Sequence, residues 1–230
     1  MARRIAICLT LVAVAATALP AAAGAVTGRS VAVTASATIK VPNDTATIGF
    51  GVKRERRTRA AALSATAAAL RKVIATAQAF PGVGEGDIDT GRVDVRTVKK
   101  GTATVYRASE GASVTLHEPS KAGELISKGI AAGATGVSGP SFSVGNREAA
   151  FGKALAAAFD KAKERATVLA AQAGATLGPA LTIEEGEGAQ FVEPVAAEEK
   201  AASGPAGATP PTKPGKSTVE ATVHVVFELL

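Results

Sequence analysis

The fold is decided by one stretch, residues 148–173, which reads EAAFGKALAAAFDKAKERATVLAAQA. Its apolar residues recur at steps of three and four, the period of an α-helix with one buried side. Charged side chains occupy the opposite side, so we expect this helix to be half exposed. Asn146 is a candidate N-cap, and Gly174 a candidate residue just past the C-terminal end. The expected buried stripe is Phe151, Leu155, Phe159, Ala162, Ala166 and Leu169.

A sheet is the natural partner for this helix, and the chain supplies its strands. Residues 218–228 form the strongest candidate, because apolar and polar residues alternate along them. The same alternation predicts strands at residues 30–38, 45–52, 92–98, 104–116, 138–144 and about 180–184. Lys99-Lys100-Gly101 separates two of them and indicates a hairpin.

Two further helices are expected between these strands. Residues 58–80 would bury Leu63, Ala67, Leu70, Ile74 and Ala77, and residues 120–132 would bury Leu125, Ile126 and Ile130. Helices interleaved with hairpins, rather than strict βαβ repetition, indicate an α+β fold. We therefore expect a mostly antiparallel sheet with helices packed on one face, with two βαββ-like halves as one possible arrangement.

The domain organisation follows from composition. Residues 1–25 have a basic start, an apolar core and a small-residue cleavage site, which predicts a secretory signal peptide; the alternative is an uncleaved anchor. The only cysteine, Cys8, lies inside this segment, so the exported chain would have no disulfide and no thiol chemistry. Residues 26–230 are expected to form one domain. Within it, residues 186–216 are rich in Pro, Gly and Ala and predict a mobile loop.

Charge and aromatic content exclude several classes of partner. The formal charge is +6, and removal of Arg3 and Arg4 with the signal peptide leaves +4. A mild and mixed charge favours solubility over nucleic-acid binding, so no nucleic acid is expected as a partner. The chain has no Trp, one Tyr and seven Phe. Stacking platforms for bases or sugars are hard to build from so few rings.

No set of residues predicts catalysis, a cofactor or a metal. Gly82, Gly84 and Gly86 follow a helix and precede no Lys-Ser/Thr, which favours a plain loop over a phosphate cradle. Asp87 and Asp89 lack the remaining ligands of a calcium loop. The two histidines, His117 and His224, have no second ligand at metal-binding spacing. Glu184-Glu185 leaves glycoside chemistry open as a weaker alternative, and no serine nucleophile motif is present.

The basic run at residues 53–59 is the best local indication of a partner. Its cations would contact an anionic surface such as lipid or lipopolysaccharide, while the simpler interpretation is a solvated junction between strand and helix. The candidate contact residues are Lys53, Arg54, Arg56, Arg57 and Arg59.

Five segments together resemble the SIMPL-domain family, which includes bacterial periplasmic immunogenic and oxidative-stress defence proteins. The resemblance covers residues 30–230. Its segments are Val41-Pro42-Asn43-Asp44-Thr45-Ala46, in place of V-x-P-D-x-A, the turn Asp87-Ile88-Asp89-Thr90, Gly133-Ala134 before a strand containing Phe142, the alanine cadence from Ala154 to Gly174, and Pro214-Gly215 before the last strand. The chain departs from the family in its extra Asn43, in Ser36 and Thr38 at the place of a Gly pair, and in a hairpin with Tyr106 as its one tyrosine.

The resemblance implies an exported α+β protein, large oligomers in some members and a role in oxidative-stress protection, with no established active site. We therefore expect a non-enzymatic, self-assembling protein of the periplasm or envelope, acting in envelope integrity or stress tolerance. The alternatives are a binding module for a small ligand or an anionic envelope component, and an unrecognised hydrolase. A concave pocket with a few convergent polar groups would favour the binding module.

Overall fold

A computed structural model describes residues 28–186, 188, 190–192 and 212–230. The expected signal peptide and most of the expected 186–216 loop lie outside the described residues. The described elements are β1 (Ser30–Pro42), β2 (Thr45–Arg56), α1 (Arg59–Gln78), β3 (Ile88–Thr90), β4 (Asp94–Lys100), β5 (Ala103–Leu116), α2 (Ala122–Ala131), β6 (Gly136–Ser143), α3 (Arg147–Gln172), β7 (Leu177–Glu185), β8 (Gln190–Val192) and β9 (Lys216–Leu229), with short 3-10 turns at Glu85–Asp87 and Pro119–Lys121.

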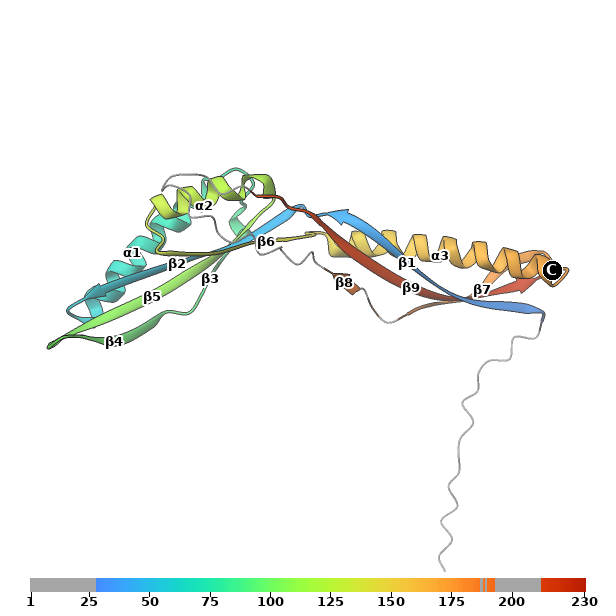
Figure 1. Cartoon of the computed structure of the whole chain (residues 1–230), viewed down its shortest axis with the longest axis horizontal. Helices are drawn as coiled ribbons and strands as arrows, with labels where there is room; N and C mark the ends of the chain where they lie inside the picture. Colours follow the sequence, from blue (N-terminus) through green and yellow to red (C-terminus); the bar gives the residue numbers. More distant parts are fainter. Residues whose placement is uncertain (1–27, 187, 189, 193–211) are drawn as a thin grey trace, which may run out of the picture.

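The strands form two antiparallel sheets, each in its own lobe, and the lobes lie end to end (Figure 1). Lobe A contains β1, β9 and β7 in that order, with β8 paired to β9, and α3 covers one face. Lobe B contains β3, β5, β2 and β6, with β4 paired to β5, and is covered by α1 and α2. The α+β class and the antiparallel pairing are confirmed, with two sheets in place of the expected one.

Helix α3 packs on β1 and β9, as its amphipathic pattern predicts, but the buried stripe is different from the expected one. The fully buried positions are alanines at every fourth residue, while Leu169 is 49% exposed and Phe151, Leu155 and Phe159 are half-buried at the flanks. Alanine lets the backbone approach the sheet closely. A four-residue row also drifts about 40° per step around a helix, which suits a twisted sheet. The stripe is Ala150, Ala154, Ala158, Ala162, Ala166 and Ala170.

Lobe B has the larger side chains in its core. Phe50, Ile48 and Val52 of β2 point toward the helices, with Val114 and Leu116 of β5 beside them. On α1 the buried residues are Ala62, Thr66, Leu70, Val73 and Ala77, so the expected stripe was offset: Leu63 is 36% exposed, and Ala67 and Ile74 are half-buried. On α2, Leu125 and Ile126 are buried as expected, whereas Ile130 is exposed.

One described helix, α1, is long and apolar enough to cross a membrane, but in this structure it packs against β5 and β2. Within the expected 186–216 loop, Gln190–Val192 form the short strand β8 and pair with β9. The hairpin at Lys99-Lys100-Gly101 is confirmed as the β4–β5 turn.

A small polar cluster joins the lobes. Asn43 is 4% exposed; its side chain donates to the Pro214 carbonyl at 2.7 Å and accepts from the Ser217 hydroxyl at 2.6 Å. Asp44 accepts the Gly145 amide at 2.7 Å. These bonds connect the segment between β1 and β2 to the start of β9 and to the segment after β6. They therefore hold together the segments of chain that pass from one lobe to the other.

Candidate functional site

His117 lies at the end of β5 and meets Asp87, a residue that spacing alone did not connect with it. His117 Nε2 is 3.0 Å from Asp87 Oδ1, and the other carboxylate oxygen accepts the Gly84 amide at 2.6 Å. The pKa of Asp87 is lowered, first by the Gly84 hydrogen bond and then by His117. These bonds anchor the loop after α1 to the end of β5, which is a structural role for the glycine-rich segment.

His224 lies on the face of lobe A that is opposite α3. Its Nδ1 is 2.9 Å from the Thr34 hydroxyl across the β1–β9 pair. Across the described ranges, no cluster of three or more His, Cys, Asp or Glu side chains could hold a metal ion. Each histidine therefore has one local partner, His117 in a loop contact and His224 in a cross-strand contact on the face of its sheet.

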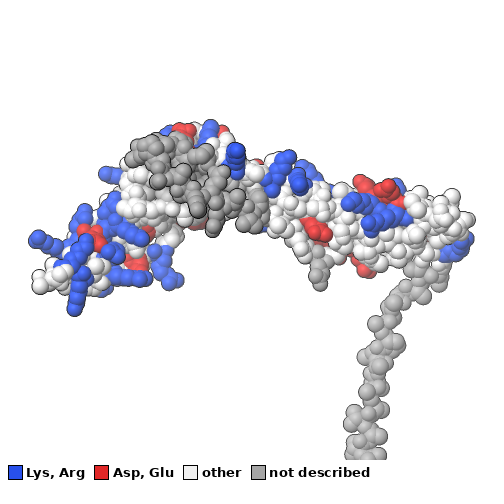
Figure 2. All heavy atoms as spheres, in the orientation of Figure 1, with Lys and Arg blue, Asp and Glu red and all other residues white. Residues whose placement is uncertain are grey.

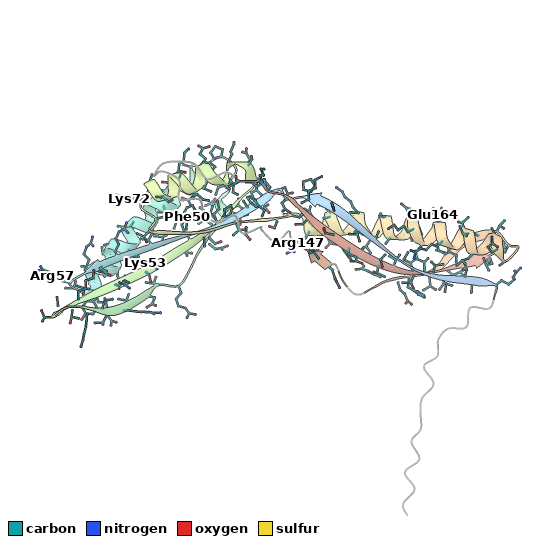
Figure 3. All side chains as sticks on the ribbon, viewed as in Figure 1. Phe50, Lys53, Arg57, Lys72, Arg147 and Glu164 are labelled. Atoms are coloured by element: carbon teal, nitrogen blue, oxygen red, sulfur yellow. The ribbon has the colours of Figure 1, made fainter. Side chains whose placement is uncertain are left out.

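The basic run of the sequence lies at the outer end of lobe B, where β2 ends and α1 begins (Figure 3). The structure divides its members. Arg54 turns to the Gly133 carbonyl, to which its Nη2 donates at 3.0 Å, and so is partly structural. Arg59 lies over the Tyr106 ring at 6.0 Å from its centroid. Lys53, Arg56 and Arg57 are exposed.

The β4–β5 hairpin adds four more cations, and Arg92, just before β4, adds a fifth; the sequence run did not reveal them. Together with three carboxylates they give this region, called the basic end, a net charge of +7, while the other described residues carry equal numbers of cations and carboxylates. Figure 2 shows lysine and arginine gathered there. The basic end comprises Lys53, Arg54, Arg56, Arg57, Arg59, Arg92, Arg96, Lys99, Lys100 and Arg107, with Glu55, Asp94 and Glu110.

Glu55 holds the basic end together. Its carboxylate accepts from Lys100 at 2.5 Å and from Arg107 at 2.7 and 2.9 Å. These hydrogen bonds, Lys100 first, lower the pKa of Glu55. One carboxylate thus binds two cations of the hairpin to β2, and Arg57, Lys99 and Arg92 have no ion pair among the described residues.

The face of lobe B opposite its helices carries an open groove of about 760 Å³, called the glycine groove. Four glycines lie side by side at its floor, three of them in β2, β5 and β6 and one, Gly91, directly after β3. Gly91 bonds to Gly111, and Gly51 pairs with both Gly111 and Gly136. Serine hydroxyls line the neighbouring row, with Lys53 and Asp89 also at the groove. The floor is therefore bare backbone between polar side chains.

Packing does not require most of these glycines. A Cβ at Gly136 would have no atom within 4 Å, and at Gly51 or Gly91 it would make only ordinary contacts at 3.7 and 3.5 Å. Glycine weakens a strand interior, and such positions are typical where a ligand or another backbone approaches closely. The sequence signal for this groove is Gly49 and Gly51 on one face of β2, with Gly111 opposite Gly51 on β5. The prediction of strands from alternating apolar residues did not reveal it.

A second groove of about 720 Å³, called the β1-edge groove, runs between α3 and the edge of β1 on which no other described strand pairs. Val168 and Leu169 of α3 are 58% and 49% exposed within it. Arg165 donates to the Thr34 carbonyl at 3.1 Å, and Lys161 to the Ser36 carbonyl at 3.4 Å. Two outward-facing carbonyls of an edge strand are thus covered by long cationic side chains.

Comparison with known proteins identifies the family of the chain. The family model described as "SIMPL: Protein of unknown function (DUF541)" matches residues 31–227. The "26 kDa periplasmic immunogenic protein" of Brucella abortus (strain S19) is 25% identical over 212 residues, covering 86% of this chain and 84% of that protein. Its periplasmic location supports the export predicted from the N-terminal sequence. With a match that spans both lobes, the chain belongs to the SIMPL family.

Proposed function

We propose that this SIMPL-family protein is a non-enzymatic, self-associating component of the cell envelope. The observation that carries the proposal is the position of β1, a 13-residue strand that forms one edge of the sheet of lobe A. An edge strand presents unpaired N–H and C=O groups on which another chain can pair. The exposed Val168 and Leu169 beside it would add apolar contact to such pairing.

Light scattering coupled to size-exclusion chromatography tests the association. We expect the exported protein to form oligomers at micromolar concentration, and a strict monomer would overturn the proposal. Val168→Lys should weaken assembly, because it replaces exposed apolar surface in the groove with a hydrated charge. Ile130→Lys is the matched control: Ile130 is 54% exposed and Val168 58%, and both lie on helices, but Ile130 lies on α2 of lobe B, away from β1.

We propose further that the protein supports envelope integrity or tolerance to oxidative stress without itself removing oxidants. Met1 and Cys8 are the only sulfur-containing residues of the chain, and both precede the expected cleavage site. Without them, no side chain can be oxidised reversibly as sulfur is. A strain lacking the protein should become sensitive to peroxide or detergent, while the purified exported protein should consume no peroxide. Consumption at a catalytic rate would contradict the indirect role.

A second candidate function, a ligand-binding module, is favoured by the glycine groove. Its convergent hydroxyls and bare floor fit the concave site expected of such a module. Lys53 and Asp89, on different strands, could bind the opposite charges of an extended zwitterionic peptide. Tetra-alanine is a suitable probe of that chemistry.

Glycine amide signals in an NMR titration would report this binding. Tetra-alanine should shift the signals of Gly51, Gly91 and Gly136. Gly136→Val should abolish the shifts at Gly51 and Gly91, because it places a side chain in the groove at a position where the Cβ meets no atom within 4 Å. Gly86→Val is the control, since its Cβ is equally unhindered but it lies in the Glu85–Asp87 turn outside the groove. Shifts that persist in Gly136→Val would remove the groove as the site.

A further inference from the structure

We propose that the basic end is a docking surface for an anionic lipid bilayer, which the protein meets end-on. This goes beyond self-association, and it rests only on the exported location. The whole net charge of the described residues lies in this one region. A molecule with its excess charge at one end of its long axis is both attracted to and oriented by an anionic surface.

The shape of the basic end favours a flat surface over a linear polymer. All but one of its cations come from the end of β2, the start of α1 and both strands of the β4–β5 hairpin, which converge at the outer end of lobe B (Figures 1 and 2). The remaining one, Arg92, lies just before β4. Only Lys53 among them lines either groove. A polyanionic chain is usually bound along a groove, whereas a convex end presents its charges to a plane.

The contact should be electrostatic and reversible. Val93 and Leu63 are the only large apolar side chains exposed among the described residues near this end, at 44% and 36%. With so little apolar surface to insert, binding depends on cations within a Debye length of the lipid charges. Arg57 and Lys99 are suited to this, because both are exposed and form no ion pair among the residues described.

Co-sedimentation with vesicles tests the proposal. The exported protein should bind vesicles of phosphatidylglycerol and phosphatidylcholine, should not bind phosphatidylcholine alone, and should be released by 0.5 M salt, about three times physiological strength. Arg57→Gln with Lys99→Gln should weaken binding roughly 20- to 30-fold, since each basic residue near the surface contributes about 5-fold. Lys153→Gln with Lys163→Gln, on exposed positions of α3, removes the same charge and should change binding less than 2-fold.

Three results would overturn the proposal. The first is no binding to anionic vesicles at low salt, and the second is an equal loss in both double variants, which would indicate a dependence on net charge alone. The third is tighter binding to a soluble acidic polysaccharide such as alginate than to vesicles at the same salt, which would assign the basic end to a polymer. Circular dichroism of both variants checks that the fold is unchanged. The oligomeric state is measured separately, so the failure of this proposal leaves the self-association test unaffected.

Discussion

Replacement of Gly129 by alanine should destabilise the protein, although alanine is the better helix former. Gly129 is buried in α2, directly against the Phe50 ring. A Cβ at this position would lie 2.8 Å from both Cδ1 and Cζ of Phe50, and closer still to Cε1. Phe50 is 2% exposed and is held in the core of lobe B, so the ring cannot turn away. Either α2 must move outward or the core must repack.

The size of the effect follows from two opposing contributions. Alanine gains up to about 1 kcal/mol over glycine in a helix interior, whereas overpacking a core typically costs about 1–3 kcal/mol and occasionally more. We expect the clash to dominate, with a net loss of about 1–2 kcal/mol. For a chain of this length the melting temperature should fall by about 2–8 °C.

Gly152→Ala provides the matched control. Gly152 lies on the exposed side of α3, and a Cβ there would have no atom within 4 Å. The same substitution should therefore stabilise by about 0.5–1 kcal/mol, because only the helix-propensity gain remains. Urea denaturation gives both free energies of unfolding. It is followed by circular dichroism and by fluorescence of Tyr106, the single tyrosine, which reports on lobe B. Equal stabilisation by both variants would refute the close packing of α2 on Phe50.

Three further predictions concern the helix stripe, the acidic loop and the edge of β1. Ala162→Leu should lower the free energy of unfolding by about 1–3 kcal/mol, because Ala162 is fully buried between α3 and the sheet of lobe A. Ala156→Leu, on the exposed side of α3, should change it by less than about 0.5 kcal/mol. Asp87 has a lowered pKa, so its stabilisation is present above the unfolded value of 3.8 and is lost as pH falls through the folded value. The difference in melting temperature between the unmodified protein and Asp87→Asn should be measurable at pH 7 and should shrink as the pH falls below 3.8; a constant difference would contradict the charge-based role. Lys161→Ala with Arg165→Ala uncovers two edge carbonyls of β1 and should increase the oligomer size seen by light scattering, and no increase would show that these side chains do not shield the edge.

The helical periodicity was strong enough to predict α3, its N-cap and its sheet partner. Asn146 does accept the Ala149 amide, and α3 packs on β1 and β9. The prediction of the buried face was wrong because it followed the largest apolar residues, as if the helix packed on the sheet through large side chains. In α3 the distance between helix and sheet is set by alanine, and the phenylalanines fill the flanks.

Sequence reasoning predicted about half of the basic end and none of the glycine groove. A run such as residues 53–59 is visible because its cations are adjacent, but Arg96, Lys99 and Arg107 join them only through the β4–β5 and β2–β5 registers. The groove likewise depends on register, since its glycines come from three separate strands and from the segment after β3. Side chains that act together across strands cannot be recognised until the pairing is known.

The two proposed surfaces lie in different lobes, which allows one chain to use both at once. The β1 edge belongs to lobe A and the basic end to the outer end of lobe B, and the buried bond from Ser217 to Asn43 holds the segment that passes from β1 to β2 against the start of β9. Copies that associate through β1 would each carry a basic end, so an oligomer would present several weak lipid contacts at once. Linked contacts of this kind increase the overall affinity far beyond that of one site. A protein whose single contact is weak and salt-sensitive could thus be retained at a membrane only when it is assembled, and self-association would then control its attachment to the envelope.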